Sequence, residues 1–222
     1  MRANAAIDQL HRFHQSRQMQ SSDSNLASDL LAHDQLRWQA LGIVEALNLP
    51  QGCIGAGFVR NLVWDHLHGR ACDCREKDID VLFFDQSTTD PAYDAEIEVK
   101  LRANAPDLNW SVKNQARMHL RNHDAPYVSV KDAMRFWPET ATAVAAMRSK
   151  NDFIIIAPYG LSDLEGLILR PTSAEPHKIA AFHTRIQAKN WRTRWPKVRV
   201  IGVSDRARRL SAVGSLRRHP IL

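Results

Sequence analysis

The chain has 222 residues and a formal charge of +6, and 44% of its residues are hydrophobic. These values suit one domain with a core of its own, and three cysteines, an odd number, argue against a disulfide framework. No stretch approaches the ~20 apolar residues of a membrane span, and the first residues lack the apolar core of a signal peptide. We therefore expect a cytoplasmic protein without a membrane partner.

The positive charge is concentrated at the C-terminus. Residues 192–222 contain nine lysines and arginines against one acid, Asp205, whereas residues 1–191 contain 21 basic and 23 acidic residues. The body of the chain is therefore not a basic nucleic-acid-binding surface. We expect any binding of nucleic acid to depend on the C-terminal tail and to weaken steeply as the salt concentration rises.

Composition divides the chain into three parts. Residues 1–27 are polar and predict a loosely attached helix followed by a linker, while residues 28–200 carry the hydrophobic patterning of a folded domain. Residues 201–222 predict a basic, flexible tail. Within the domain, apolar residues recur at helical spacing from Leu30 onward until Pro50 stops the run.

Strand and helix patterns alternate through the first half of the domain. Short apolar runs and alternating apolar residues predict strands, whereas longer stretches with helical spacing predict helices. The predicted elements are a strand at 52–56, a helix at 58–68, a strand at 79–84, a helix at 91–104 that Pro91 begins, a strand at 109–115 and a helix at 115–120.

The second half of the domain is predicted to be mostly helical. Ser129 and Asp132 can cap a short helix, and Pro138 favours the start of another that continues through Met147. The remaining predicted elements are a strand at 153–157, a helix at 162–169, a loop at 171–176 and a helix at 177–194. Together the patterns predict an α/β fold, in which a small mixed sheet carries packed helices and the C-terminal half is mostly helical.

Asp78 and Asp80 are the candidate catalytic and metal-binding residues. Side chains alternate along a strand, so these two carboxylates at the start of an apolar run point to the same side. Their mutual repulsion would be relieved by a divalent cation, and Mg²⁺ (or Mn²⁺) is commonly held by one or two carboxylates together with substrate phosphates. The pair therefore predicts a metal site, and the alternative is a solvated strand start.

A small-residue turn upstream supplies candidate nucleotide-binding residues. Gly55 and Gly57 flank an alanine just before a predicted helix, where small side chains let backbone amides approach phosphate groups. Arg60 and Asn61 fall in the first turn of that helix and can contact phosphate oxygens. The alternative for Arg60 is an exposed helix cation.

Several segments that appear in one order carry a family resemblance. They are Gly55–Asn61, Trp64–Gly69, Asp78–Asp85, Lys113–His119, Pro126–Thr140 and Ala157–Leu164. Over about residues 30 to 200 the chain resembles a bacterial nucleotidyltransferase-like family of the DNA polymerase beta-type superfamily. The resemblance implies the α/β core of that superfamily and a Mg²⁺-dependent transfer of a nucleotidyl group from a nucleoside triphosphate to a hydroxyl-bearing acceptor, which it does not identify.

The resemblance also implies a third acid on a neighbouring strand, and the chain departs from it there. The predicted strand at 109–115 has no carboxylate and offers Lys113, which can neutralise phosphate charge. Glu96, Glu98 or Asp85 is left to supply the further ligand that a two-metal arrangement needs. This departure leaves open a nucleotide-binding module with weak or no catalysis.

The glycine turn also resembles the start of the dinucleotide-binding pattern Gly-x-Gly-x-x-Gly. The position of the third glycine holds Arg60, whose bulk would hinder close packing of the helix on its strand. The ribose-binding acid should end the second strand, where only Asp85 has the right character. The pattern thus fits only in part, and a Rossmann-type dinucleotide binder is kept as the second alternative.

Overall fold

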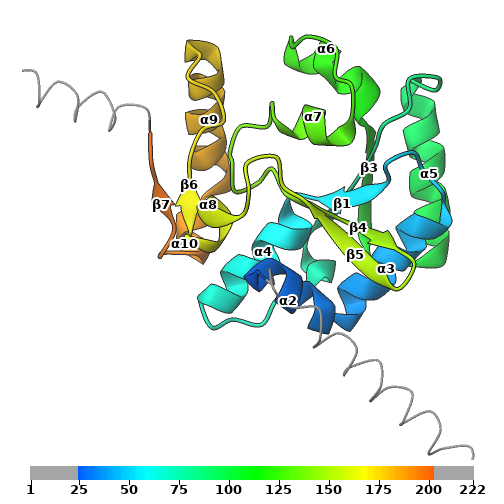
Figure 1. Ribbon diagram of the computed structural model, residues 1–222, viewed down its shortest axis with the longest axis horizontal. Coiled ribbons are helices and arrows are strands. Elements are labelled where there is room, and N and C mark those ends of the chain that lie inside the picture. The colour runs from blue at the N-terminus through cyan, green and yellow to red at the C-terminus, as the bar shows by residue number, and fades with distance from the viewer. Residues whose placement is uncertain (1–24, 203–222) are drawn as a thin grey trace, which may run out of the picture.

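The computed structural model describes residues 25–202, which form a five-stranded sheet with helices packed around it (Figure 1). The strand order is β3-β2-β1-β4-β5, in which β2 and β3 are parallel and the other neighbours are antiparallel. The strands are β1 (Cys53–Gly55), β2 (Asp78–Phe83), β3 (Asn109–Asn114), β4 (Ala145–Ser149) and β5 (Asp152–Ile156). The predicted α/β fold with a small mixed sheet is confirmed.

The apolar run before Pro50 forms two helices, α2 (Leu26–His33) and α3 (Gln35–Ala46). They are separate because Asp34 has an extended backbone and its side chain accepts a hydrogen bond from Arg37 N over 2.9 Å, which caps the second helix. Most of the segments predicted at 1–27 and 201–222 lie outside the described residues.

The other α-helices of residues 25–202 lie between or after the strands along the chain, which also has two short 3-10 helices, Cys74–Glu76 and Gln115–Arg117. These α-helices are α4 (Gly57–Leu67), α5 (Pro91–Asn104), α6 (Met118–Asn122), α7 (Val130–Met134), α8 (Ser162–Glu165), α9 (Pro176–Lys189) and α10 (Trp191–Arg194). A second, two-stranded sheet pairs β6 (Ile168–Leu169) with β7 (Arg199–Val200). Within this part of the chain, no helix has the length and apolar character needed to cross a membrane.

Alternation along β2 divides its side chains between the two faces of the sheet. Ile79 and Val81 are buried in a core that also contains residues of α3, α4 and α5. On the opposite face, Leu82 is buried in a second, smaller core with residues of α7. Asp78 and Asp80 precede Leu82 on this second face, where Asp78 is exposed and Asp80 is half-buried.

The helix predicted from Pro138 to Met147 is wrong. Residues 138–144 form turns and a short connection, and β4 begins at Ala145. Alanine favours helices in isolation, but tertiary packing overrides that preference here. Ala145 and Ala146 are both fully buried on opposite faces of a strand that lies between β1 and β5.

Two predicted helices of the second half differ from the structure. The predicted helix at 162–169 ends at Glu165, and the one at 177–194 is broken at Asn190, which has a left-handed φ of 46°.

The strand pairing decides the Rossmann alternative. β1 and β2 run antiparallel, whereas a Rossmann unit joins parallel strands. This topology overturns the dinucleotide-binding alternative.

Asp65 links α4 to the C-terminal segment. Its buried carboxylate accepts hydrogen bonds from Trp195 Nε1 over 2.7 Å and from Arg194 over 2.9 Å. The ring of Trp64 packs edge-on against Trp195, with centroids 5.1 Å apart. Burial opposes the charge of Asp65, but the hydrogen bonds from Arg194 and Trp195 outweigh it and lower the pKa of the carboxyl group.

Replacing Asp65 by Asn should lower the free energy of unfolding by about 2–3 kcal/mol, because Arg194 loses its counter-charge and charged hydrogen bonds are lost. The lowered pKa means that the contribution of Asp65 is present above the pKa of the unfolded chain and disappears as the pH falls through the folded value. Chemical denaturation at neutral and acidic pH measures both effects. The exposed Asp107→Asn variant is the control, and an equal loss in the two variants would contradict the role of Asp65.

Candidate active site

Asp78 and Asp80 lie next to one another on the face of β2 that also carries Leu82 and the smaller core. Their positions two residues apart place both carboxylates on this face. Asn109, on the neighbouring strand β3, donates a hydrogen bond from Nδ2 to Asp78 Oδ1 over 2.6 Å. The two predicted metal-binding residues are therefore brought together, and Asn109 orients one of them.

The electrostatics of this pair fit a divalent cation. Burial and the neighbouring charge of Asp78 raise the pKa of Asp80, although the positive charges of Arg60, Arg185 and Lys189 oppose the rise. An ionised carboxylate in such a place is stabilised by a further positive charge. Hard oxygen donors on one face are the ligands that Mg²⁺ or Mn²⁺ prefers.

Strand β1 brings the glycine turn to the acid pair. Gly55 is the direct antiparallel partner of Asp80. The chain then turns through Ala56 and begins α4 at Gly57. Within the described residues, no side chain caps this helix, so its first backbone N–H groups are left for another acceptor. A helix N-terminus of this kind attracts anions such as phosphate.

Close contacts explain both glycines of the turn. A Cβ atom at Gly55 would lie 2.8 Å from Cδ1 of Leu82, and one at Gly57 would lie 3.2 Å from Nδ2 of Asn61. The first distance is too short for carbon atoms, and the second would displace the amide group. Glycine on both sides of Ala56 therefore avoids displacing the side chains of Leu82 and Asn61.

Ala56 has a backbone conformation that suits glycine. Its φ of 54° and ψ of −116° lie outside the regions that L-residues favour. The N–H of Ala56 donates to Val144 O over 2.8 Å, and its carbonyl accepts from Arg60 N over 3.0 Å. These hydrogen bonds hold the residue in place, so backbone strain is stored at the turn beside the acid pair.

Arg60 is buried behind the turn, so the alternative of an exposed helix cation is wrong. Its guanidinium donates to Asn61 Oδ1 over 2.8 Å and to Thr142 Oγ1 over 3.2 Å, and it lies 4.7 Å from the ring centroid of Trp191. Burial lowers the pKa of Arg60 to about 10, which leaves the side chain charged at neutral pH. Its charge reaches Asp80 from within the protein.

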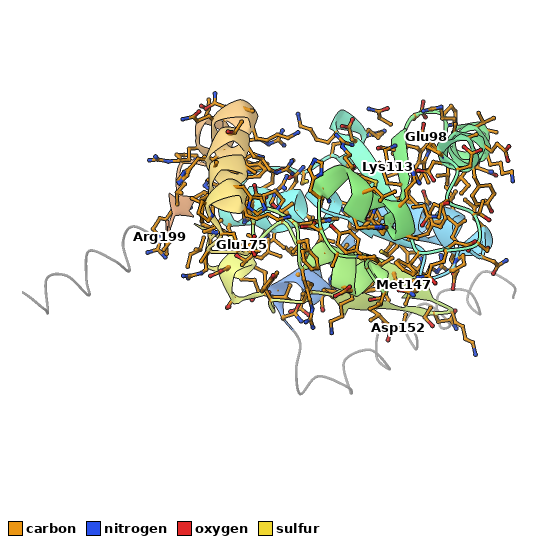
Figure 2. The ribbon with its side chains drawn as sticks, turned by 90° about the horizontal axis from the view of Figure 1, so that it is seen from above. Glu98, Lys113, Met147, Asp152, Glu175 and Arg199 are labelled. Atoms are coloured by element: carbon orange, nitrogen blue, oxygen red, sulfur yellow. The ribbon has the colours of Figure 1, made fainter. Side chains whose placement is uncertain are left out.

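The structure does not bring Lys113 to the acid pair. Lys113 Nζ donates to Val112 O over 2.7 Å and lies 3.7 Å from Glu98 Oε1. Figure 2 shows the side chains of Lys113 and Glu98 near one another beside α5. Glu96 is exposed on α5, and Asp85 follows the opposite end of β2. Within residues 25–202, no group of three or more His, Cys, Asp or Glu side chains is placed to hold a metal ion.

Charged residues that the sequence analysis did not single out complete the site. Arg185 and Lys189 of α9 are close enough to oppose the rise in the pKa of Asp80, and the fully buried Glu139 pairs with Arg185. A basic residue on an exposed helix has no local pattern that marks it as functional. Only the tertiary structure brings the charges of Arg185 and Lys189 within electrostatic reach of Asp80.

Comparisons with known proteins bear on the fold and the family of the chain. Residues 42–200 match a family model described as Nucleotidyltransferase. A solved structure, described as an NMR structure that reveals a CCA-adding enzyme head domain, is 31% identical with a TM-score of 0.74, and the alignment covers 83% of this chain and 98% of that chain. A search of curated proteins found no match.

Larger CCA-adding enzymes resemble the chain at lower identity. A CCA-adding enzyme in complex with CTP is 18% identical with a TM-score of 0.54, and the alignment covers 87% of this chain and 47% of that chain. The Thermotoga maritima CCA-adding enzyme complexed with tRNA is 18% identical with a TM-score of 0.52, and 81% and 43% of the two chains are covered. The chain spans less than half the length of these enzymes, and the likeness concerns the fold alone.

Replacing Ala56 by Gly should raise the free energy of unfolding by about 1 kcal/mol, because glycine adopts the positive φ without strain. The matched variant Ala95→Gly, at an exposed position within α5, should instead lower it by about 0.5–1 kcal/mol. Denaturant unfolding of both variants measures the two signs. A loss of stability in both would show that the turn carries no strain.

Proposed function

Since the chain belongs to the nucleotidyltransferase family, we propose that Asp78 and Asp80 are its catalytic, metal-binding residues and that Mg²⁺ (or Mn²⁺) is its cofactor. The nucleotidyl group comes from a nucleoside triphosphate and passes to a hydroxyl-bearing acceptor. The observation that carries the proposal is the pairing of Asp80 with Gly55, because it sets two carboxylates beside the uncapped start of α4.

Each part of the site has a separate task in this proposal. Asp78 and Asp80 hold the metal ion, and Asn109 keeps the Asp78 carboxylate oriented. When bound, such an ion neutralises phosphate charge and polarises the phosphoryl group under attack. The protein contributes by placing the acids on a rigid strand, where their spacing is fixed before the nucleotide arrives.

The glycine turn supports binding of the phosphates. Gly55 and Gly57 leave room for a close approach to the backbone amides that begin α4. Arg60 and Asn61 hold this turn from behind, and the guanidinium adds positive charge to the site. Lys113 is not part of this proposal, because its ammonium group donates to Val112 O and lies 3.7 Å from Glu98 Oε1.

A second candidate function is nucleotide binding with weak catalysis. The observation that favours it is the lack of a third suitable carboxylate among the described residues, because two-metal catalysis usually uses a further bridging ligand. Solved structures of CCA-adding enzymes are described with ATP, CTP and tRNA. ATP and CTP are therefore the first donors to test, and tRNA is the first acceptor.

Calorimetric titration with ATP in the presence of Mg²⁺ should show binding that Asp80→Asn weakens by roughly 10- to 100-fold, because one of two metal-binding charges is lost. The control is Asp85→Asn, which makes the same change beyond the opposite end of β2 and should bind as the unmodified protein does. Circular dichroism checks that both variants fold. Equal affinity in the two variants would exclude the metal site at Asp80.

Turnover separates the two candidate functions. Incubation with labelled ATP or CTP, Mg²⁺ or Mn²⁺, and tRNA or a cell extract should release pyrophosphate and label an acceptor. Asp80→Asn should reduce the rate by roughly 100-fold or more, since even outer-shell changes at metal sites cost 10- to 100-fold. Tight nucleotide binding without pyrophosphate release under any of these conditions would favour the binding module.

A further inference from the structure

Helix α9 turns one face toward the body of the protein and lies at the opposite side of the sheet from α5 (Figure 1). Lys178, Phe182, Arg185 and Lys189 recur every three or four residues and therefore share this face. Phe182 is fully buried, and most other side chains of α9 are exposed. Arg185 and Lys189 thus come toward the body one helical turn apart.

Arg185 is held by a buried carboxylate that leaves most of its guanidinium unused. Arg185 Nε lies 3.1 Å from Glu139 Oε1 and donates a hydrogen bond to Oε2 over 3.2 Å. Glu139 is fully buried, whereas 34% of the Arg185 side chain is exposed. Within the described residues, the two terminal nitrogens of Arg185 make no hydrogen bond. They form a planar fork that can bind two phosphate oxygens.

Trp191 connects Arg185 with the glycine turn. The Cζ atoms of Arg185 and Arg60 lie 5.6 Å and 4.7 Å from the centroid of the Trp191 ring. A terminal nitrogen of Arg60 lies 3.6 Å from the position that a Cβ atom on Gly57 would occupy. Gly57 begins α4, two residues after the partner of Asp80. These contacts connect Arg185, through Trp191 and Arg60, to the start of α4.

The charges of the cluster balance only until a metal ion binds. The charged neighbours of Asp80 are Asp78, Arg60, Arg185 and Lys189, and Glu139 pairs with Arg185, so the cluster holds three cations and three acids. The charges of Arg185 and Lys189 act on Asp80, and Lys189 has no ion pair among residues 25–202. A divalent cation at the acid pair would neutralise two carboxylates and leave these cations in excess. A polyanionic triphosphate would restore the balance.

Building on the function proposed above, we propose that Arg185 and Lys189 bind the triphosphate of the nucleotide and that Glu139 is a positioning residue for Arg185. The carboxylate of Glu139 takes the Nε side of the guanidinium, which leaves the two terminal nitrogens available for phosphate oxygens. Lys189 adds a second, mobile point charge one turn further along α9.

The test compares ATP with AMP by calorimetry in the presence of Mg²⁺. Arg185→Met should weaken ATP binding by about 10- to 100-fold and Lys189→Met by about 3- to 10-fold, because charge-assisted contacts to phosphate are lost. AMP lacks the two outer phosphates, so its affinity should change less. Arg192→Met removes an exposed cation of α10, and its ATP affinity should equal that of the unmodified protein.

Glu139 is tested through its coupling to Arg185. Glu139→Gln should weaken ATP binding but add little when combined with Arg185→Met, since both changes disturb one contact. Its Mg²⁺ affinity without nucleotide should stay unchanged, which a general loss of structure would not allow. Additive losses in the double variant would overturn the positioning role.

The outcomes separate this inference from the proposed function. If Asp80→Asn loses ATP affinity while Arg185→Met and Lys189→Met bind ATP as tightly as Arg192→Met, the α9 assignment is overturned and the nucleotide site at β2 stands. If the unmodified protein does not bind ATP or CTP with Mg²⁺, both proposals fail. Lys189 is exposed, so Lys189→Met should fold normally. A loss of ATP affinity in this variant therefore reports the lost charge and not misfolding.

Discussion

The antiparallel pairing of β1 with β2 is the constraint on which the site depends. Their register sets Gly55 opposite Asp80, and the chain leaves β1 directly into the turn and α4. A shift of one residue would move both acids to the buried face of the sheet. Ile79 and Val81 oppose such a shift because they are buried among the helices on that face. The hydrophobic core therefore fixes where the carboxylates stand.

Local patterns were enough to predict the first half of the fold. The strands at β2 and β3, the helices α4 and α5, and the acid pair all have signals within a few residues of sequence: alternation, a proline at a helix start, or small residues at a turn. These signals survive in the structure because the local preference and the tertiary packing agree. The predicted resemblance to nucleotidyltransferases follows the same segments and is confirmed by the family match.

The errors arose where distant contacts decide the structure. Pro138 and the alanines that follow it favour a helix locally, but the place between β1 and β5 makes Ala145 and Ala146 part of a strand. Lys113 was proposed to contact phosphate because it lies on the strand where a third acid was expected, and in the structure its ammonium group donates to Val112 O and lies 3.7 Å from Glu98 Oε1. Glu139 and Arg185 are 46 residues apart and meet only after α9 has docked. No window of sequence contains such information.

The buried position of Arg60 has a consequence for the order of events during synthesis. Its hydrogen-bond partner Thr142 follows 82 residues later, and the ring of Trp191 follows later still. A growing chain that has made only the acid pair and the glycine turn therefore carries an arginine without the groups that enclose it. Such long-range closure is entropically costly until the whole set is available. The groups that enclose Arg60 are therefore complete only once synthesis has passed Trp191, close to the end of the described chain.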